Sequence, residues 1–344
     1  MISLHPRARF QLIGIIPLAL LIFLIRLSQP TVTLAQSPPP VYLPIILKPD
    51  PSGVSYPPTP EWLQYLNQYR AQALLPSLKE EPTWSEGAWK HARYMVKNDL
   101  ITHTEDPKNQ WYSPEGETAG RNGNVMISTS FSYTEAQAID LWLQGPFHAL
   151  GILHPRLEWT GFGIYHEDIG TYKTGAVMDV LRGRTTYPLD AIGYPIFWPG
   201  NRQITWLNRY VGGEYPDPLA PCGYHAPSGL PIIIQLGNGN LSPQIKHSDL
   251  HGQGNSLPHC IYTENTYTNP DSSQQNLARS ILNAQDAVVL IPQAPLKDGS
   301  YTVLLTIAVA PNGPDTTYIW TFEVTTTVTS QYLPETLGDR SQTQ

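Results

Sequence analysis

The sequence predicts an α+β domain followed by an all-β sandwich. Between residues 59 and 184, segments with helical spacing of apolar residues precede two short apolar runs that are typical of strands. After residue 184 helical periodicity is scarce, and short β-rich runs alternate with turn signals as far as residue 327. The 34 prolines and 26 glycines suit a loop-rich exported protein with β structure.

Residues 1–35 have the features of a secretory signal peptide. Arg7 and Arg9 precede an apolar run at residues 12–25, and TLA at residues 33–35 places small residues before the expected cleavage site. The apolar run is shorter than the roughly 20 residues that a spanning helix needs, which favours export over an uncleaved membrane anchor. We therefore expect an extracellular or cell-surface location.

The first two helices are expected after a proline-rich linker at residues 36–58. Thr59 is a suitable N-cap for the first helix, and Pro60 suits its first helical position. A second helix is expected from about residue 83, and His91 lies on its apolar stripe as a packed core residue.

A third helix and two strands complete the first domain. The helix is expected to begin at Thr134, because Thr134 and Gln137 have the spacing of a capping box. Residues 161–166 and 174–181 follow as strand-like runs. Helices followed by strands predict a short sheet between helical layers, over residues 59–184.

Residues 185–327 predict an antiparallel β-sandwich. Its β-rich runs are PIIIQLG (231–237), AVVLIP (287–292), SYTVLLTIAVA (300–310) and TTYIWTFEVTT (316–326). PNGPD separates the last two runs and is a strong hairpin signal. The end of this segment resembles the last strands of bacterial Ig-like modules, which implies an Ig-like sandwich. The polar residues 328–344 are expected to be disordered.

The chain has two cysteines, Cys222 and Cys260, and both lie in the β-rich half. Exported proteins reach an oxidising compartment, where such a pair forms a disulfide. Closing a loop of this length stabilises a fold by roughly 3–4 kcal/mol. We therefore predict one disulfide between them.

Short motifs occur in a fixed order along the first domain. They are LNQYR (66–70), HARYM (91–95), ITHTED (101–106), AGRNGN (119–124), LWLQGPFHALGIL (141–153) and TGFGIY (160–165). In this order and spacing they resemble the CAP superfamily, the SCP or PR-1-like secreted domains, in their bacterial form. The resemblance implies a CAP-type α-β-α sandwich, with a central cavity that gathers two histidines and acidic residues.

This resemblance assigns candidate site residues and shows one difference between this chain and the family pattern. His103 and His148 match the cavity histidines of the family. The family's acidic residue falls at position 121, where this chain has Arg121 followed by Asn122, and Glu117 lies close before them. These five side chains are the expected ligand-binding set.

Three interpretations of the cavity stay open. His103 and His148, with Glu117 swung in, are suitable zinc ligands, although Arg121 repels a dication at short range. Alternatively, Arg121 and the two histidines form a cationic pocket for a carboxylate or phosphate. In the third interpretation the same groups form a polar network that only stabilises the fold.

A second group of histidines, His247, His251 and His259, lies in the β-rich half. The i, i+4 spacing of the first two suits a shared metal only on a helix. Gly252 and Gly254 predict a loop instead, so no metal site is expected there.

The sequence favours a non-catalytic binding module, whose ligand is a lipid, a small anion or a protein partner. The alternative is a metal-assisted hydrolase that uses zinc on His103 and His148, with Glu117 as general base. A purely structural spacer is the third class. The net charge of −7 and the lack of any Lys/Arg-rich block exclude nucleic acid as a partner. Membrane contact is expected only through an uncleaved signal segment.

Overall fold

The structure is a computed structural model that describes residues 59–186, 193–310 and 313–326. The predicted signal peptide, the linker and the whole of the predicted tail lie outside the described residues. The described residues belong to one compact unit. Below, the N-terminal region denotes residues 59–186 and the C-terminal region denotes residues 193–326.

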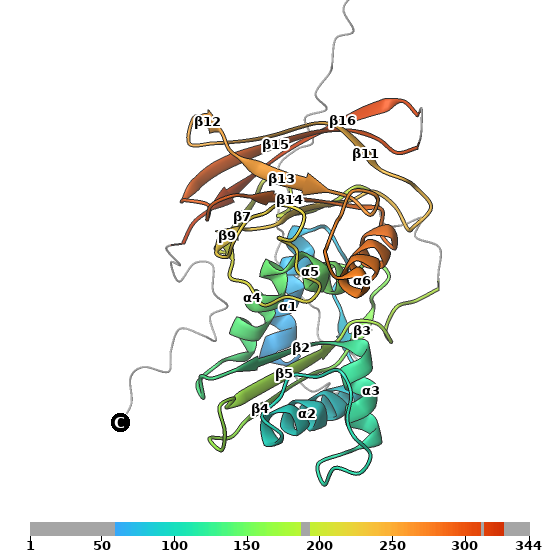
Figure 1. Cartoon of the computed structure of the whole chain (residues 1–344), viewed down its shortest axis with the longest axis vertical. Helices are drawn as coiled ribbons and strands as arrows, with labels where there is room; N and C mark the ends of the chain where they lie inside the picture. The colour runs from blue at the N-terminus through green and yellow to red at the C-terminus, as the bar shows by residue number, and fades with distance from the viewer. Residues whose placement is uncertain (1–58, 187–192, 311–312, 327–344) are drawn as a thin grey trace, which may run out of the picture. The chain divides into compact units, whose positions relative to one another are not determined.

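In the N-terminal region a three-stranded antiparallel sheet lies between two layers of helices (Figure 1). The strands pair in the order β2 (Gly123–Ser128), β5 (Thr174–Asp179), β4 (Phe162–His166). One face is covered by α2 (Pro82–Lys97) and α3 (Pro114–Asn122). The other face carries α1 (Glu61–Gln72), α4 (Glu135–Gln144) and α5 (Pro146–Ile152). A short parallel pair joins β1 (Lys79–Glu80) to β3 (Trp159–Thr160).

The central strand β5 is buried on both faces because both helical layers pack on it. Val177 joins an apolar cluster with Ala88 and Ala92 of α2. Its neighbours Ala176 and Met178 point to the opposite face and join the main core. Because alternate side chains of β5 pack on opposite helical layers, this one strand connects the two layers.

Local sequence signals explain where the helices begin. The capping box of Thr134 and Gln137 is present at the start of α4, which confirms that prediction. The prediction for α1 was wrong by one residue, because Pro60 is the N-cap and the helix begins at Glu61. α2 begins slightly earlier than expected, since the Glu81 side chain accepts a hydrogen bond from the Thr83 backbone N–H.

The C-terminal region contains two larger sheets and one helix. The first is antiparallel, in the order β13 (His259–Tyr262), β14 (Ala287–Pro292), β10 (Ile232–Gln235), β6 (Ile196–Trp198). The second has the order β12 (Asn255–Ser256), β11 (Gln244–Gly252), β15 (Gly299–Ala308), β16 (Asp315–Val324), β7 (Gln203–Thr205). A small pair and a helix complete the region: β8 (Arg209–Tyr210), β9 (Ser228–Gly229) and α6 (Ser272–Asn283).

The predicted strands of this region are present, but two segments differ from expectation. β15 and β16 pair antiparallel over their full length, as the hairpin signal between them predicts. The loop predicted around His247 and His251 is wrong: both lie in β11, which pairs with β15. Helix α6 was not expected either.

The two regions share one hydrophobic core. It includes Trp62 and Trp142 from the helical layer together with Ile233 of β10 and Val289 of β14. β10 and β14 are buried along their whole length. Among the residues that the structure describes, no helix has the length and apolarity required to span a membrane.

Candidate functional site

The candidate histidines His103 and His148 line one pocket of about 400 Å³, and Arg121 lines it with them. Part of the wall comes from α6, so the C-terminal region helps to form the pocket. Glu117 and Asn122 are not among the lining residues. The structure therefore brings three of the five expected ligand-binding side chains together.

His148 is held by a carboxylate from the C-terminal region. It lies in the first turn of α5, and its Nδ1 is 2.6 Å from Oε1 of Glu214. The same oxygen accepts a hydrogen bond of 2.7 Å from the His148 backbone N–H. Since a carboxylate accepts hydrogen bonds, the imidazole proton lies on Nδ1. Nε2 makes no hydrogen bond within the described part of the chain and is left for a ligand.

Glu214 is a site residue that the sequence did not indicate. It belongs to the segment between β8 and β9, 66 residues after His148. Its carboxylate side chain is 2% exposed, and its backbone N–H donates to the Tyr210 hydroxyl. Its second oxygen, Oε2, is buried without a hydrogen-bond partner among the described residues. Gly212 and Gly213 before it indicate only a turn, so no motif marks this position.

Close packing around this pair requires a glycine at the end of α4. A Cβ atom placed on Gly145 would lie 2.6 Å from Oε1 of Glu214, well inside van der Waals contact. Gly145 also caps the N-terminus of α5, ahead of Pro146. The same residue therefore starts the helix that carries His148 and leaves room for its partner.

His103 is neutral around pH 7 and presents its second ring nitrogen. Its Nδ1 donates to the Gly120 carbonyl oxygen at 2.8 Å. Neighbouring atoms displace water from part of the ring and lower the pKa of His103, and the nearby His148 and His91 lower it further. Nε2 of His103 therefore carries a lone pair and has no hydrogen-bond partner in the described residues.

Arg121 places a positive charge at the pocket, and Glu117 holds it there. The Arg121 Nε donates to Oε1 of Glu117 at 2.5 Å, and the arginine side chain is 60% exposed. The other Glu117 oxygen accepts a hydrogen bond from the Glu105 backbone N–H. Both oxygens of Glu117 are engaged, whereas the terminal nitrogens of Arg121 make no hydrogen bond in the described residues.

The asparagine at the pocket is Asn124. Asn122 donates its side-chain N–H to the Thr118 carbonyl oxygen at 2.8 Å, within α3. Asn124, on β2, is buried and donates to the His148 carbonyl oxygen at 3.2 Å. It therefore connects the sheet to the backbone of the helix that carries His148.

The residues present do not fit a zinc site. Within the described ranges, no group of three or more His, Cys, Asp or Glu side chains is placed to hold a metal ion. A catalytic zinc usually has three protein ligands, and Glu117 is occupied by Arg121. Arg121 also opposes a dication by charge.

His91 has a structural role next to the pocket. It is fully buried, with Nδ1 2.9 Å from Oε1 of Glu105 and Nε2 2.8 Å from the Thr102 carbonyl oxygen. A Cβ on Gly120 would lie 2.4 Å from the ring, so α3 packs directly on it. His91 connects α2 to the segment that carries His103.

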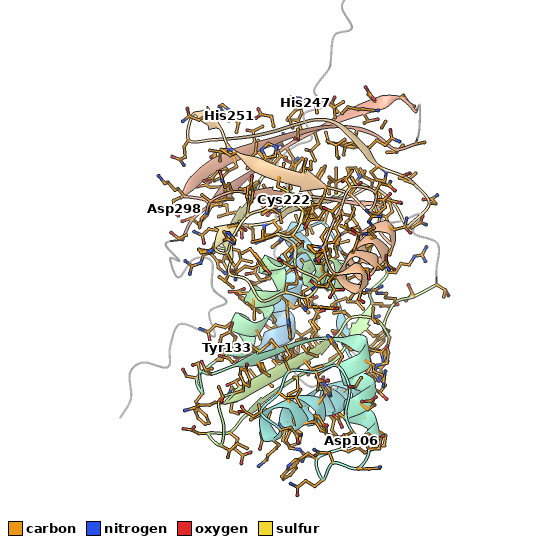
Figure 2. All side chains as sticks on the ribbon, in the orientation of Figure 1. Asp106, Tyr133, Cys222, His247, His251 and Asp298 are labelled. Atoms are coloured by element: carbon orange, nitrogen blue, oxygen red, sulfur yellow. A yellow bond between two sulfur atoms is a disulfide. The ribbon has the colours of Figure 1, made fainter. Side chains whose placement is uncertain are left out.

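The remaining polar candidates do not line the pocket; Cys222, His247 and His251 are labelled in Figure 2. Cys222 and Cys260 form a disulfide with Cα atoms 5.4 Å apart. It joins β13 to the segment that carries Glu214. His247 and His251 are exposed on β11, and His259 contacts the Ser248 hydroxyl at 3.0 Å.

Comparisons with known proteins identify the first domain. No curated protein matches the chain. A similar solved structure is that of selenomethionine PcoC, a copper resistance protein from Escherichia coli, at 14% identity and a TM-score of 0.20. The match covers 38% of this chain and 95% of PcoC, and so low a TM-score does not indicate a shared fold. Residues 63–180 match the model of the cysteine-rich secretory protein family, CAP. These residues therefore form a CAP domain.

Proposed function

We propose that this protein is a non-catalytic binding module whose CAP-domain pocket takes a small organic anion, namely a carboxylate with an apolar body. One observation carries the proposal. The pocket is lined by Arg121, Arg184, His103 and His148, and by no acidic side chain within the described residues. Guanidinium groups bind carboxylates through paired hydrogen bonds.

Arg184 keeps its charge although it is partly buried. Its Nε donates to the Val180 carbonyl oxygen at 2.8 Å. Loss of water lowers its pKa to about 10, and Asp179 partly offsets this. The group is therefore still a cation at pH 7, and an anionic ligand would compensate its lost hydration.

The rest of the wall suits an apolar ligand body. Phe147 from α5 lines the pocket with Leu181, and Leu277 and Ile281 from α6 lie across it. Leu181 and Leu277 are 43% and 42% exposed, so both present apolar surface that a ligand can cover. A ligand that covers them gains hydrophobic free energy of about 25 cal/mol per Å² of buried surface.

His148 supplies a second kind of contact. With Nδ1 paired to Glu214, the ring presents its Nε2 edge to the ligand. Glu214 is thus a positioning residue, which sets the ring orientation from outside the CAP domain.

The metal-assisted hydrolase is less well supported. Its general base would be Glu117, whose two oxygens are bonded to Arg121 and to the Glu105 backbone. Its metal would lack a third protein ligand in the described residues. Stoichiometric zinc retained after dialysis would favour this alternative over the proposed one.

We also propose that the chain is exported and that its C-terminal region is an Ig-like sandwich. The apolar N-terminal segment with its small-residue site supports export. The two sheets with a shared apolar interior, and the β15–β16 hairpin, support the sandwich.

The proposal is tested by calorimetric titration with octanoate and with octanamide, its uncharged analogue. We expect octanoate to bind at least tenfold more tightly than octanamide, because only the carboxylate pairs with the arginines. Arg121→Gln should remove most of that difference. Lys297→Gln makes the same charge change at an exposed position outside the pocket and should leave it intact. Equal affinities for the two compounds would refute an anion site.

A further inference from the structure

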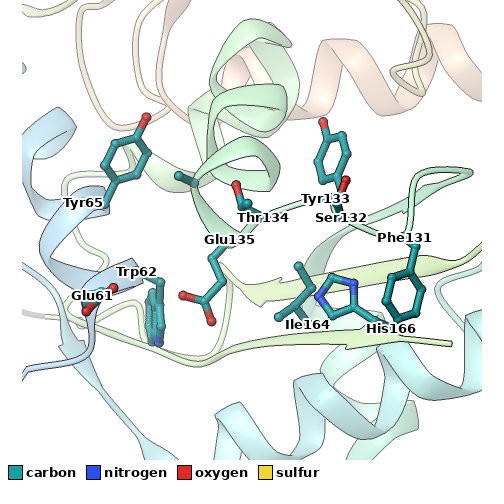
Figure 3. Close-up of a pocket in the computed structure, with 11 residues that line it drawn as sticks. Glu61, Trp62, Tyr65, Phe131, Ser132, Tyr133, Thr134, Glu135, Ile164 and His166 are labelled. Carbon is teal, nitrogen blue, oxygen red and sulfur yellow. The ribbon is translucent and has the colours of Figure 1, made fainter. Parts of the chain in front are cut away.

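A second pocket, of about 440 Å³, lies between the starts of α1 and α4 and strand β4 of the CAP domain (Figure 3). It is bounded by the start of α1, by residues 131–136 at the start of α4, and by Ile164 and His166 of β4. It shares no lining residue with the pocket around His103 and His148. The two sites are therefore chemically independent.

Aromatic side chains form much of this wall. They are Trp62, Tyr65, Phe131 and Tyr133. The Trp62 indole is fixed by stacking on Phe162, with ring centroids 5.3 Å apart. Phe131 is 54% exposed and meets the His166 ring edge to face at 5.9 Å. Aromatic faces carry negative electrostatic potential and attract cations.

Two carboxylates lie among these rings without a cationic partner. Glu61 and Glu135 make no ion pair and no side-chain hydrogen bond within the described residues, although each lies in the first turn of its helix. In Figure 3 the Glu135 side chain extends from α4 toward the space between Trp62 and Ile164. Partial burial raises the pKa of Glu135, and the negative charges of Glu61 and Glu80 raise it further.

The neighbouring histidine adds no positive charge. His166 donates from Nδ1 to the Thr174 hydroxyl oxygen at 2.8 Å, because that hydroxyl donates its own proton to the Ser130 carbonyl. Burial lowers the pKa of His166, so the ring is neutral at pH 7. The pocket thus combines two negative charges with apolar rings and has no arginine or lysine in its wall.

This chemistry selects an organic cation over a metal ion or a fatty acid. In the described part of the chain, no three acidic, histidine or cysteine groups come together as metal ligands. An anionic lipid would be repelled by Glu61 and Glu135. We propose that this pocket binds a small organic ammonium ion, held by the carboxylates of Glu61 and Glu135 and by the faces of Trp62, Phe131 and Tyr133.

The test is a ligand-observed NMR titration of the full chain with choline and with 3,3-dimethyl-1-butanol, its uncharged carbon analogue. We expect choline to bind at least tenfold more tightly than the analogue. Glu135→Gln should weaken choline binding at least fivefold, since it removes the half-buried charge and keeps the shape of the side chain. Phe131→Leu should weaken it about threefold, because the side chain stays apolar but loses its ring.

Glu323→Gln is the matched control. Glu323 is exposed on β16, outside this pocket, and the substitution changes the net charge by the same amount as Glu135→Gln. Unchanged choline affinity in Glu323→Gln, with loss in Glu135→Gln, supports the site. Equal binding of the two compounds, no binding of choline, or equal effects of the two glutamine variants would each overturn it. Circular dichroism of each variant checks that the fold is intact.

Discussion

Single buried polar residues in this protein are satisfied by partners distant in sequence. Arg70 is fully buried, and its guanidinium donates to the carbonyl oxygens of Pro76, Ile152, His154 and Leu157. Loss of water lowers the pKa of Arg70 to about 9, but the group is still charged at pH 7. Four carbonyl acceptors compensate for its lost hydration, and so the arginine ties α1 to the end of α5.

His154 lies beside this arginine and should make stability depend on pH. Burial and, after it, charge repulsion from Arg184, Arg156 and Arg70 together lower its pKa to about 3. The folded state therefore keeps His154 neutral, while the unfolded chain takes up a proton below about pH 6.5. Stability from this group is full above pH 6.5 and is lost as the pH falls toward 3, by about 1 kcal/mol per pH unit.

His154→Asn checks this dependence, because asparagine keeps an acceptor for the Arg156 backbone N–H, which donates to Nδ1 in the structure. Urea unfolding between pH 6.5 and 4 should show a shallower loss of stability in the variant than in the unmodified protein. His251→Asn, at an exposed position on β11, is the control and should run parallel to the unmodified protein. Parallel curves for His154→Asn would contradict the assignment.

At the scale of elements, predictions succeeded where the signal was local. Thr134 and Gln137 predicted the start of α4 because both partners of a capping box lie within one turn. α6 was missed although Leu277, Ala278, Ile281 and Leu282 recur at helical spacing, because this stripe covers only the last two turns and follows the polar run SSQQN. β11 is mostly polar, and its extended form depends on pairing with β15, more than 50 residues later.

In the candidate site, too, local sequence signals predicted residues, whereas a residue brought in by long-range packing was missed. Motif spacing indicated His103, Arg121 and His148, which the structure places on one pocket. Glu117 was assigned to the ligand set, but its local ion pair with Arg121 holds it away from the wall. Glu214 could not be predicted from the sequence, because only the packing of the segment between β8 and β9 on α5 brings it to His148.

The disulfide should stabilise the segment that carries Glu214. Cys222 lies eight residues after Glu214, and its bond to Cys260 fixes that segment to β13. Replacing both cysteines by serine should lower the free energy of unfolding by about 3–4 kcal/mol, as expected for a closed loop of 38 residues. Denaturant unfolding measures this loss, and a change below about 1 kcal/mol would contradict it. Reductant should lower the stability of the unmodified protein and leave the double variant unchanged.

At the scale of the whole molecule, the CAP domain and the C-terminal sheets stabilise each other. Trp198 of β6 donates to the Leu143 carbonyl oxygen, and Gln235 of β10 donates to that of Leu153. Gln285 donates to the Leu150 carbonyl oxygen. These bonds surround an apolar core common to both regions. Glu214 and α6 also reach the CAP-domain pocket across this contact, so the pocket depends on both regions folding together.

We therefore expect one cooperative unfolding transition. A destabilising substitution in the C-terminal region should then also lower the stability of the CAP domain. Ile233 of β10 is 1% exposed in the shared core, and Ile233→Ala should cost about 2–5 kcal/mol. Amide hydrogen exchange of β5, in the CAP domain, should accelerate in this variant, because its opening would follow global unfolding. Ile319→Ala, on β16 at 60% exposure, removes the same atoms and should leave β5 protection unchanged. If β5 kept its protection in Ile233→Ala, the two regions would unfold independently, and the common core would not govern the stability of the site.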